Sequence, residues 1–217
     1  MADDLTATAF DAEEGLDDWR YLLGRIEATY TAATPFAAAA FVAEAVATTP
    51  DRVPDIDLRG EVAHLSLPPG GPLGPTDLDA ARTLTALAAE MGLTSSPLVA
   101  IRSEIAIDAV DIDAVRTFWK AALAYEDEPT PEGQQVIALV DPLRIGPPVW
   151  FQQMDAIRPE RNHIHIDITV THDVADERVA AVIAAGGTLR YSNERSFHVL
   201  ADVEGNELCI CTWLDRD

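Results

Sequence analysis

The chain has 217 residues and 48% of them are hydrophobic, which suffices for the cores of two ordinary domains. It carries 15 basic and 37 acidic residues, a formal net charge of -22. A charge of this sign repels phosphate backbones and anionic lipid surfaces. Nucleic acid and membrane surfaces are therefore poor candidates as partners, and a small-molecule ligand is the better expectation.

The cysteines and the first residues indicate the compartment. Cys209 and Cys211 occupy alternate positions on an expected strand, where side chains point the same way, so we expect no disulfide between them. The first residues lack the basic start and apolar run of a secretory signal, and no apolar run approaches the ~20 residues of a membrane span. We expect a cytoplasmic protein.

The first part of the sequence shows apolar residues at helical spacing. The pattern predicts helix from residue 11 to residue 47, with Trp19 on the apolar side of its first part. A second helix is expected to start near Pro35, with Thr34 as its N-cap.

A strand and a further helix follow. Residues 62–67 predict a strand, and Thr76 or Asp77 is expected to cap a helix that runs to about Met91. The short, polar stretch 92–97 marks the expected boundary between the two domains.

The second half repeats one pattern at a spacing of about 60 residues, and this duplication is its most informative feature. Each copy predicts a strand, a helix and two further strands. The expected segments are 104–110, 113–125, 136–140 and 149–154, then 163–170, 174–185, 197–201 and 207–213.

Four motifs carry a resemblance in this half. They are Asp-Ile-Asp-Ala-Val-Arg-Thr-Phe-Trp at 111–119, Val-Trp-Phe-Gln at 149–152, His-Ile-His-Ile-Asp at 163–167 and Ala-Asp-Val-Glu-Gly-Asn-Glu-Leu-Cys at 201–209. In this order they resemble the glyoxalase-like domains of the vicinal oxygen chelate superfamily, which also includes bleomycin resistance proteins and dioxygenases. The resemblance implies an α+β domain of paired βαβββ modules whose sheet forms a cup for a small molecule.

Alternation along the strands shows which side chains could line that cup. Period-2 spacing sends His163, His165 and Asp167 to one face and the intervening isoleucines to the other. In the last strand, Glu207 and Cys209 likewise share a face.

The resemblance also implies a ligand set, one position on each of four strands. The matching residues are Glu104, Gln152, His165 and Cys209. Cys209 stands where the superfamily has a glutamate, so two alternatives stay open: a divalent Zn, Mn, Ni or Fe ion, or no metal. The resemblance gives catalytic roles to His165 and Glu104. The expected ligand-binding residues are Trp150, Gln152, His163, Asp167 and Glu207.

The first half is similar to pterin-4a-carbinolamine dehydratase over about residues 16–92. The matching segments are Trp-Arg at 19–20, Pro-Phe at 35–36, Pro-Asp at 54–55 and Thr-Asp-Leu-Asp at 76–79. The family's paired histidines, however, are replaced by Arg52 and Val53. Arginine stays protonated and valine cannot titrate, so neither supplies the acid and base that dehydration requires. We expect His64 to be a sheet histidine and Asp79 to favour the first turn of a helix.

Together these observations predict two domains: residues 1–97, a dehydratase-like sheet with helices that has lost its activity, and residues 98–217, the glyoxalase-like domain. The first is expected to serve binding or homodimer formation, since its relatives assemble through this fold. For the second, three functions compete: a lyase- or isomerase-type enzyme, a ligand-sequestering resistance-type protein without catalysis, and, for the whole chain, a retained pterin dehydratase.

Overall fold

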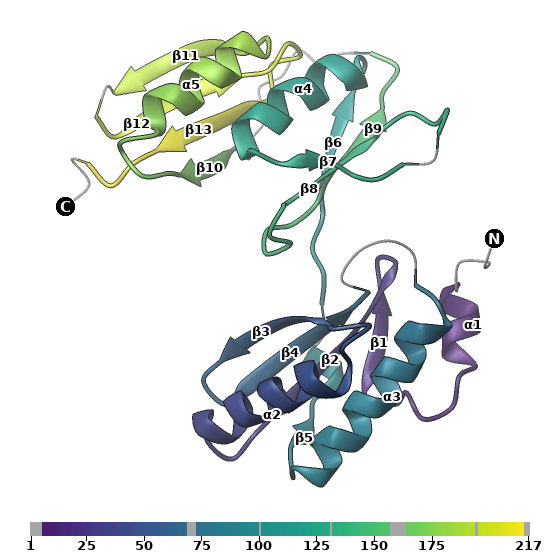
Figure 1. Ribbon diagram of the computed structural model, residues 1–217. Coiled ribbons are helices and arrows are strands. Elements are labelled where there is room, and N and C mark those ends of the chain that lie inside the picture. The colour runs from purple at the N-terminus through teal and green to yellow at the C-terminus, as the bar shows by residue number, and fades with distance from the viewer. Residues whose placement is uncertain are drawn as a thin grey trace. The chain divides into compact units, whose positions relative to one another are not determined.

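The computed structural model describes residues 6–68, 73–99, 101–130, 132–156, 164–193 and 195–214. It divides into two compact units, Met1–Arg102 and Ser103–Asp217, each with its own hydrophobic core (Figure 1). Within the described residues, no helix is both long and apolar enough to span a membrane.

The N-terminal unit is an antiparallel sheet with helices α2 and α3 packed on one face (Figure 1). The strand order is β1-β2-β4-β3, and β5 also pairs with β2. Its elements are α1 (Ala7–Asp11), β1 (Trp19–Leu22), β2 (Arg25–Thr31), α2 (Pro35–Thr48), β3 (Asp55–Arg59), β4 (Val62–Leu67), α3 (Pro75–Glu90), β5 (Thr94–Ser95) and the 3-10 turn η1 (Pro97–Val99).

The helix expected over residues 11–47 is wrong in its first part, where the chain forms the hairpin β1–β2. Ile26, Ala28 and Tyr30 are buried in the core, and the residues between them are polar, which is the period-2 pattern of a strand. The turn places Gly24 at φ +76°, a conformation that glycine adopts without strain. A burial pattern set by tertiary packing thus overrides the local helical spacing.

The caps of the two long helices differ in how well the sequence predicts them. Thr34 is confirmed as the N-cap of α2, since its side chain accepts a hydrogen bond from Ala37 N. The cap expected for α3 is wrong, because Gly74 holds that position. Asp77 instead lies in the first turn and its carboxylate accepts a hydrogen bond from Gly74 N at 2.8 Å.

The C-terminal unit confirms the duplication, because βαβββ occurs twice in succession. The first module has the strand order β6-β9-β8-β7 and the second β10-β13-β12-β11. The elements are β6 (Ile105–Ala109), α4 (Ile112–Leu123), β7 (Glu126–Asp127), β8 (Ala138–Val140) and β9 (Val149–Gln153), then β10 (Ile166–Thr169), α5 (Ala175–Ala184), β11 (Thr188–Asn193), β12 (Phe197–Ala201) and β13 (Glu207–Cys211).

One core joins the two modules. Phe118 and Trp119 of α4 share a hydrophobic cluster with Val182 of α5 and with Leu208 and Ile210 of β13. The helices lie side by side over the two half-sheets (Figure 1). Because these side chains are buried against the helices, the opposite faces of the strands are free to carry polar groups.

The chain between the units is anchored to the N-terminal sheet by a buried carboxylate. Glu27 of β2 is fully buried on the face away from the helices, and Arg102 donates a hydrogen bond to its Oε1. His64 Nε2 lies 3.4 Å from Oε2 of the same carboxylate. Ser96 N donates to Thr29 O at 2.8 Å, so the segment after β5 is held at two points.

The buried pair predicts a pH dependence. Burial alone would raise the pKa of Glu27, but hydrogen bonds and charge from His64 and Arg102 outweigh it and hold the pKa below its ordinary value. A lowered pKa means that this stabilisation is complete above the ordinary pKa, near 4.5, and is lost as the pH falls through the folded-state pKa. We expect Arg102→Ala to cost about 2 kcal/mol at neutral pH, as is typical of a lost hydrogen bond to a charged group, and less in acid.

Hydrogen exchange of the β2 amides, corrected for intrinsic rates at each pH, measures this local stability. Arg59→Ala is the matched control, since Arg59 pairs with Asp57 on the exposed surface and its loss should cost much less than that of Arg102. Equal effects of the two variants at all pH values would contradict the role of the Glu27–Arg102 pair.

Candidate functional site

Three potential metal ligands meet on the polar face of the second module. β10 and β13 are parallel neighbours in which Asp167 is the direct partner of Cys209, and His165 precedes β10 on the same face as Asp167. The ligand atoms of these three side chains all lie within 4.8 Å of one another. Among the described residues, no other group of three histidine, cysteine or carboxylate side chains lies close enough together to hold an ion.

The three side chains differ in exposure. His165 and Asp167 are about half exposed, with Nε2 and Oδ1 3.4 Å apart, whereas Cys209 is only 6% exposed. Burial, together with the Asp167 carboxylate that accepts a hydrogen bond from the thiol, raises the pKa of Cys209 to about 12. In the absence of a cation, Cys209 is therefore a protonated thiol at neutral pH.

The core side of the same strands explains this arrangement. Ile166 and Ile168 pack against the hydrophobic cluster, and Leu208 and Ile210 belong to it. Since side chains alternate along a strand, Asp167 and Cys209 must face the other way. The predicted shared face of His165 and Asp167 is confirmed by their contact.

The first module does not carry the same donors. The β6–β9 ladder begins with the pair Ile105–Val149, and the β10–β13 ladder begins with Ile166–Leu208. The next pair is Ala106–Trp150 in the first module and Asp167–Cys209 in the second, so these pairs occupy equivalent positions. Glu104 is exposed, precedes β6 and is not part of the three-residue group.

The remaining expected residues lie outside the three-residue group. Gln152 is the partner of Asp108 in the β6–β9 ladder. By the same count along the ladder, Gln152 matches Cys211 of the second module and not Cys209. Glu207 opens β13 opposite Ala201. His163 lies outside the described residues. Asp167, which the predicted metal set omitted, could have been included because His165 and Asp167 share a strand face in the sequence pattern.

A turn of the second module binds the first module. The buried Asp202 accepts hydrogen bonds from Trp119 Nε1 at 3.1 Å and from Asn206 Nδ2 at 2.8 Å. The Glu204 carboxylate accepts hydrogen bonds from Val110 N and Asp111 N, at the start of α4. A negative charge at this N-terminus also interacts favourably with the dipole of α4. This turn, part of the 201–209 motif, thus has a structural role.

In the N-terminal unit, the residues compared with the dehydratase motif are engaged elsewhere. Arg52 binds the buried Asp77 with two nitrogens, Nε at 2.8 Å and Nη2 at 2.9 Å. His64 contacts Glu27 through Nε2 and Thr29 Oγ1 through Nδ1, at 2.9 Å. Asp79 is exposed at the surface of α3. Arg52 and His64 are thus held by structural partners, and Asp79 pairs with Arg82 at the surface.

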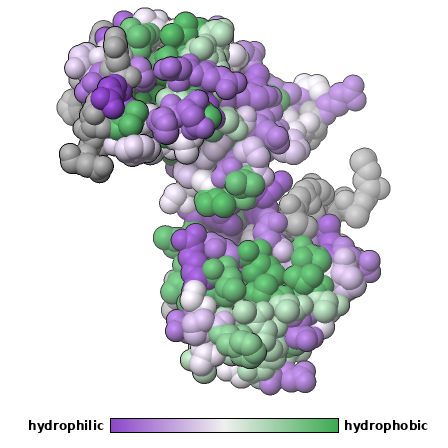
Figure 2. Space-filling model, turned by 60° about the vertical axis from the view of Figure 1, so that its left-hand side comes forward, coloured by the Kyte–Doolittle hydropathy of each residue, from purple (hydrophilic) through white to green (hydrophobic). Residues whose placement is uncertain are grey.

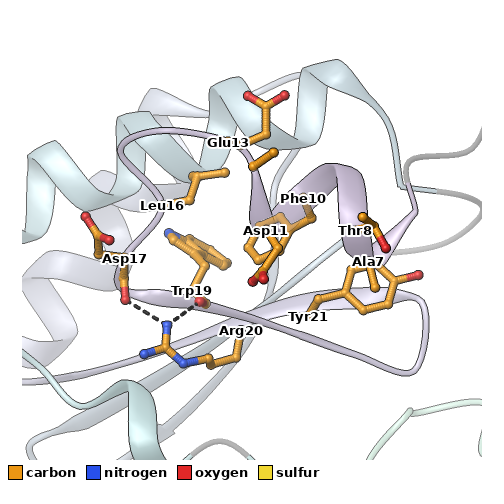
Figure 3. Close-up of a pocket in the computed structure, with 11 residues that line it drawn as sticks. Ala7, Thr8, Phe10, Asp11, Glu13, Leu16, Asp17, Trp19, Arg20 and Tyr21 are labelled. Atoms are coloured by element: carbon orange, nitrogen blue, oxygen red, sulfur yellow. Dashed lines mark hydrogen bonds between the residues drawn. The ribbon is translucent and has the colours of Figure 1, made fainter.

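A separate hollow of about 680 Å³ lies between α1 and β1 (Figure 3). Its described lining belongs to residues 7–21, so it contains none of the expected site residues. Arg20 on its wall donates to the carbonyls of Asp17 and Trp19 (Figure 3). Sequence patterns gave no signal for this hollow, because they predicted helix where β1 forms.

The model of the Glyoxalase-like domain family matches residues 104–211. No curated protein matches the sequence. Among solved structures, the fosfomycin resistance protein FosX from Mesorhizobium loti aligns at 12% identity over 52% of this chain and 91% of that one, with a TM-score of 0.43.

Two other solved structures are similar. FosX from Listeria monocytogenes, complexed with Mn(II) and sulfate, aligns at 14% identity over 52% of this chain and 90% of its own, with a TM-score of 0.42. A glyoxalase/bleomycin resistance protein/dioxygenase family enzyme from Burkholderia phytofirmans aligns at 20% identity over 52% of this chain and 98% of its own, with a TM-score of 0.38.

The environment of Cys209 predicts slow alkylation of the metal-free protein. In a Cys211→Ser background treated with a chelator, Asp167→Asn removes the charge that raises the Cys209 pKa. We expect the thiolate fraction, and the rate of reaction with iodoacetamide, to rise about tenfold at mildly alkaline pH. Mass spectrometry of the Cys209 peptide follows the reaction. Asp155→Asn, on an exposed residue, is the control, and equal rates in both variants would refute the role of Asp167.

Proposed function

We propose, from the premise that residues 104–211 form a glyoxalase-like domain of the vicinal oxygen chelate superfamily, that this domain binds a small molecule beside a divalent metal ion. The observation that carries the proposal is the convergence of His165, Asp167 and Cys209 on one strand face. Imidazole, carboxylate and thiolate groups are all established metal ligands.

The residues present fit a metal that keeps an open position. Cys209 lies at the floor of the group while His165 and Asp167 are half exposed, so the free side of an ion would face solvent. When bound, such an ion would polarise an oxygen of the small molecule. This arrangement supports a lyase- or isomerase-type enzyme ahead of a protein that only sequesters its ligand. Glu104, which lies outside the group, is a weaker candidate for catalysis than His165.

For the N-terminal unit we propose a binding or dimer-forming role in place of pterin dehydration. Arginine stays protonated and so cannot exchange the proton, and both Arg52 and His64 are held by structural partners. A retained dehydratase is thus the least supported alternative.

The outer face of α2 supports homodimer formation. Phe36 is 84% exposed, and Ala39, Ala43 and Val46 are exposed beside it. Figure 2 shows apolar surface across the visible face of this unit. Glu44 is the one charged residue among the 14 of α2. On a chain with a net charge of -22, contact through this face brings two copies together with little charge repulsion.

The first experiment measures the metal. Elemental analysis of the full chain, purified without a histidine tag, should find near-stoichiometric divalent metal that falls in His165→Ala and persists in His172→Ala. Acetohydroxamate, a bidentate oxygen ligand, should then shift the nuclear magnetic resonance signals of β10 and β13 in the wild type and in His172→Ala, but not in His165→Ala. A metal-free wild type whose signals do not respond would refute the proposal.

The dimer has its own measurement. Light scattering should give the wild-type mass as two chains, and Phe36→Glu should give one chain, because the new carboxylates would have to be desolvated in the contact. Leu143→Glu, an exposed apolar residue of the C-terminal unit, should remain a dimer. A monomeric wild type would contradict the proposal.

A further inference from the structure

The donor atoms of the candidate metal site are unusual for an ion that prefers oxygen. They comprise one imidazole nitrogen, one carboxylate oxygen and one sulfur, from His165, Asp167 and Cys209. We propose that this site selects a thiophilic ion of the zinc class, held tetrahedrally with one open position, over manganese or magnesium. The inference rests on the proposed function, whose metal it specifies.

Sulfur is the donor that decides the selectivity. Thiolates favour zinc-like ions, whereas manganese and magnesium favour carboxylate, carbonyl and water oxygens. Cys209 is 6% exposed and faces Asp167 directly across the ladder, so an ion that contacts both Asp167 and His165 meets the sulfur as well. As the metal–sulfur bond forms, Cys209 releases its proton to solvent.

The number of donors points to the same class. Three protein ligands with a fourth position open is the arrangement of catalytic zinc sites, whereas magnesium-like ions require six oxygens in near-octahedral geometry. The first module adds no donor at the equivalent ladder positions, which Ala106 and Trp150 occupy. Within the described residues, the group contains one carboxylate, that of Asp167, and this carboxylate supplies one ligand atom.

The local geometry favours a preformed group. Asp167 and Cys209 are fixed as direct partners in adjacent parallel strands, which lie about 4.8 Å apart. His165 lies on the same strand face, two residues before Asp167 in the sequence, and its Nε2 already lies 3.4 Å from Asp167 Oδ1. Binding therefore needs small side-chain rotations, with no change in the strand ladder.

Cobalt(II) is the probe, because it substitutes for zinc and reports on its ligands by absorption. Added to the metal-free full chain, it should produce the intense visible bands of tetrahedral cobalt and a near-ultraviolet thiolate-to-cobalt band. One equivalent of zinc should abolish both, while a large excess of manganese should leave them unchanged.

Variants assign the band. Cys209→Ser should remove the thiolate band and weaken zinc binding by more than about a hundredfold, since losing a ligand costs more than the 10–100-fold typical of an outer partner. Cys211→Ser is the matched control and should keep both bands. Cys209→Asp should restore binding without the thiolate band and shift the preference toward manganese, while circular dichroism verifies the fold of each variant.

The outcomes separate the two proposals. Cobalt without a thiolate band, or manganese bound as tightly as zinc through His165, would overturn the zinc-class inference and leave the proposed metal site standing. A wild type that binds none of the three ions would overturn both.

Discussion

Each module of the C-terminal unit closes on a parallel pairing between its first and last strands. In the second module this pairing joins β10 to β13, whose residues are about 40 positions apart in sequence, and makes Asp167 the partner of Cys209. The pairing survives because the alternate residues of both strands are buried against the helices. A one-residue slip would expose these isoleucines and leucines and would bury the polar residues instead. Burial on one face thus sets the positions of the functional groups on the other.

The duplication explains both the similarity and the difference between the two modules. Both keep the same topology and place apolar residues at the same ladder positions toward the helices, which is what packing requires. Nothing in packing requires the same residues on the outer face, and there the modules differ: aspartate and cysteine in the second stand where the first has Ala106 and Trp150. The symmetric fold consequently carries an asymmetric site.

The sequence predicted the second half well because its two periodicities are clear and occur twice. The strand 197–201 is confirmed at both ends, and the other elements agree within a few residues, apart from the short or weakly patterned β7 and β11. The group of three ligands was only partly predictable, since register decides which residues meet and a motif does not contain register. In the first half, Glu27 could not be recognised as a buried ion-pair residue, because its burial depends on Arg102, which is 75 residues away.

The turn that contains Asp202 and Glu204 has a consequence for how the C-terminal unit folds and evolves. Each module holds partners that the other needs: the indole of Trp119 and the first amides of α4 on one side, and two carboxylates on the other. Either module alone would lose these hydrogen bonds and would expose its half of a shared hydrophobic core. The two copies are therefore one cooperative folding unit. Deleting either copy would remove these partners from the other, so the duplicated modules behave as one indivisible domain.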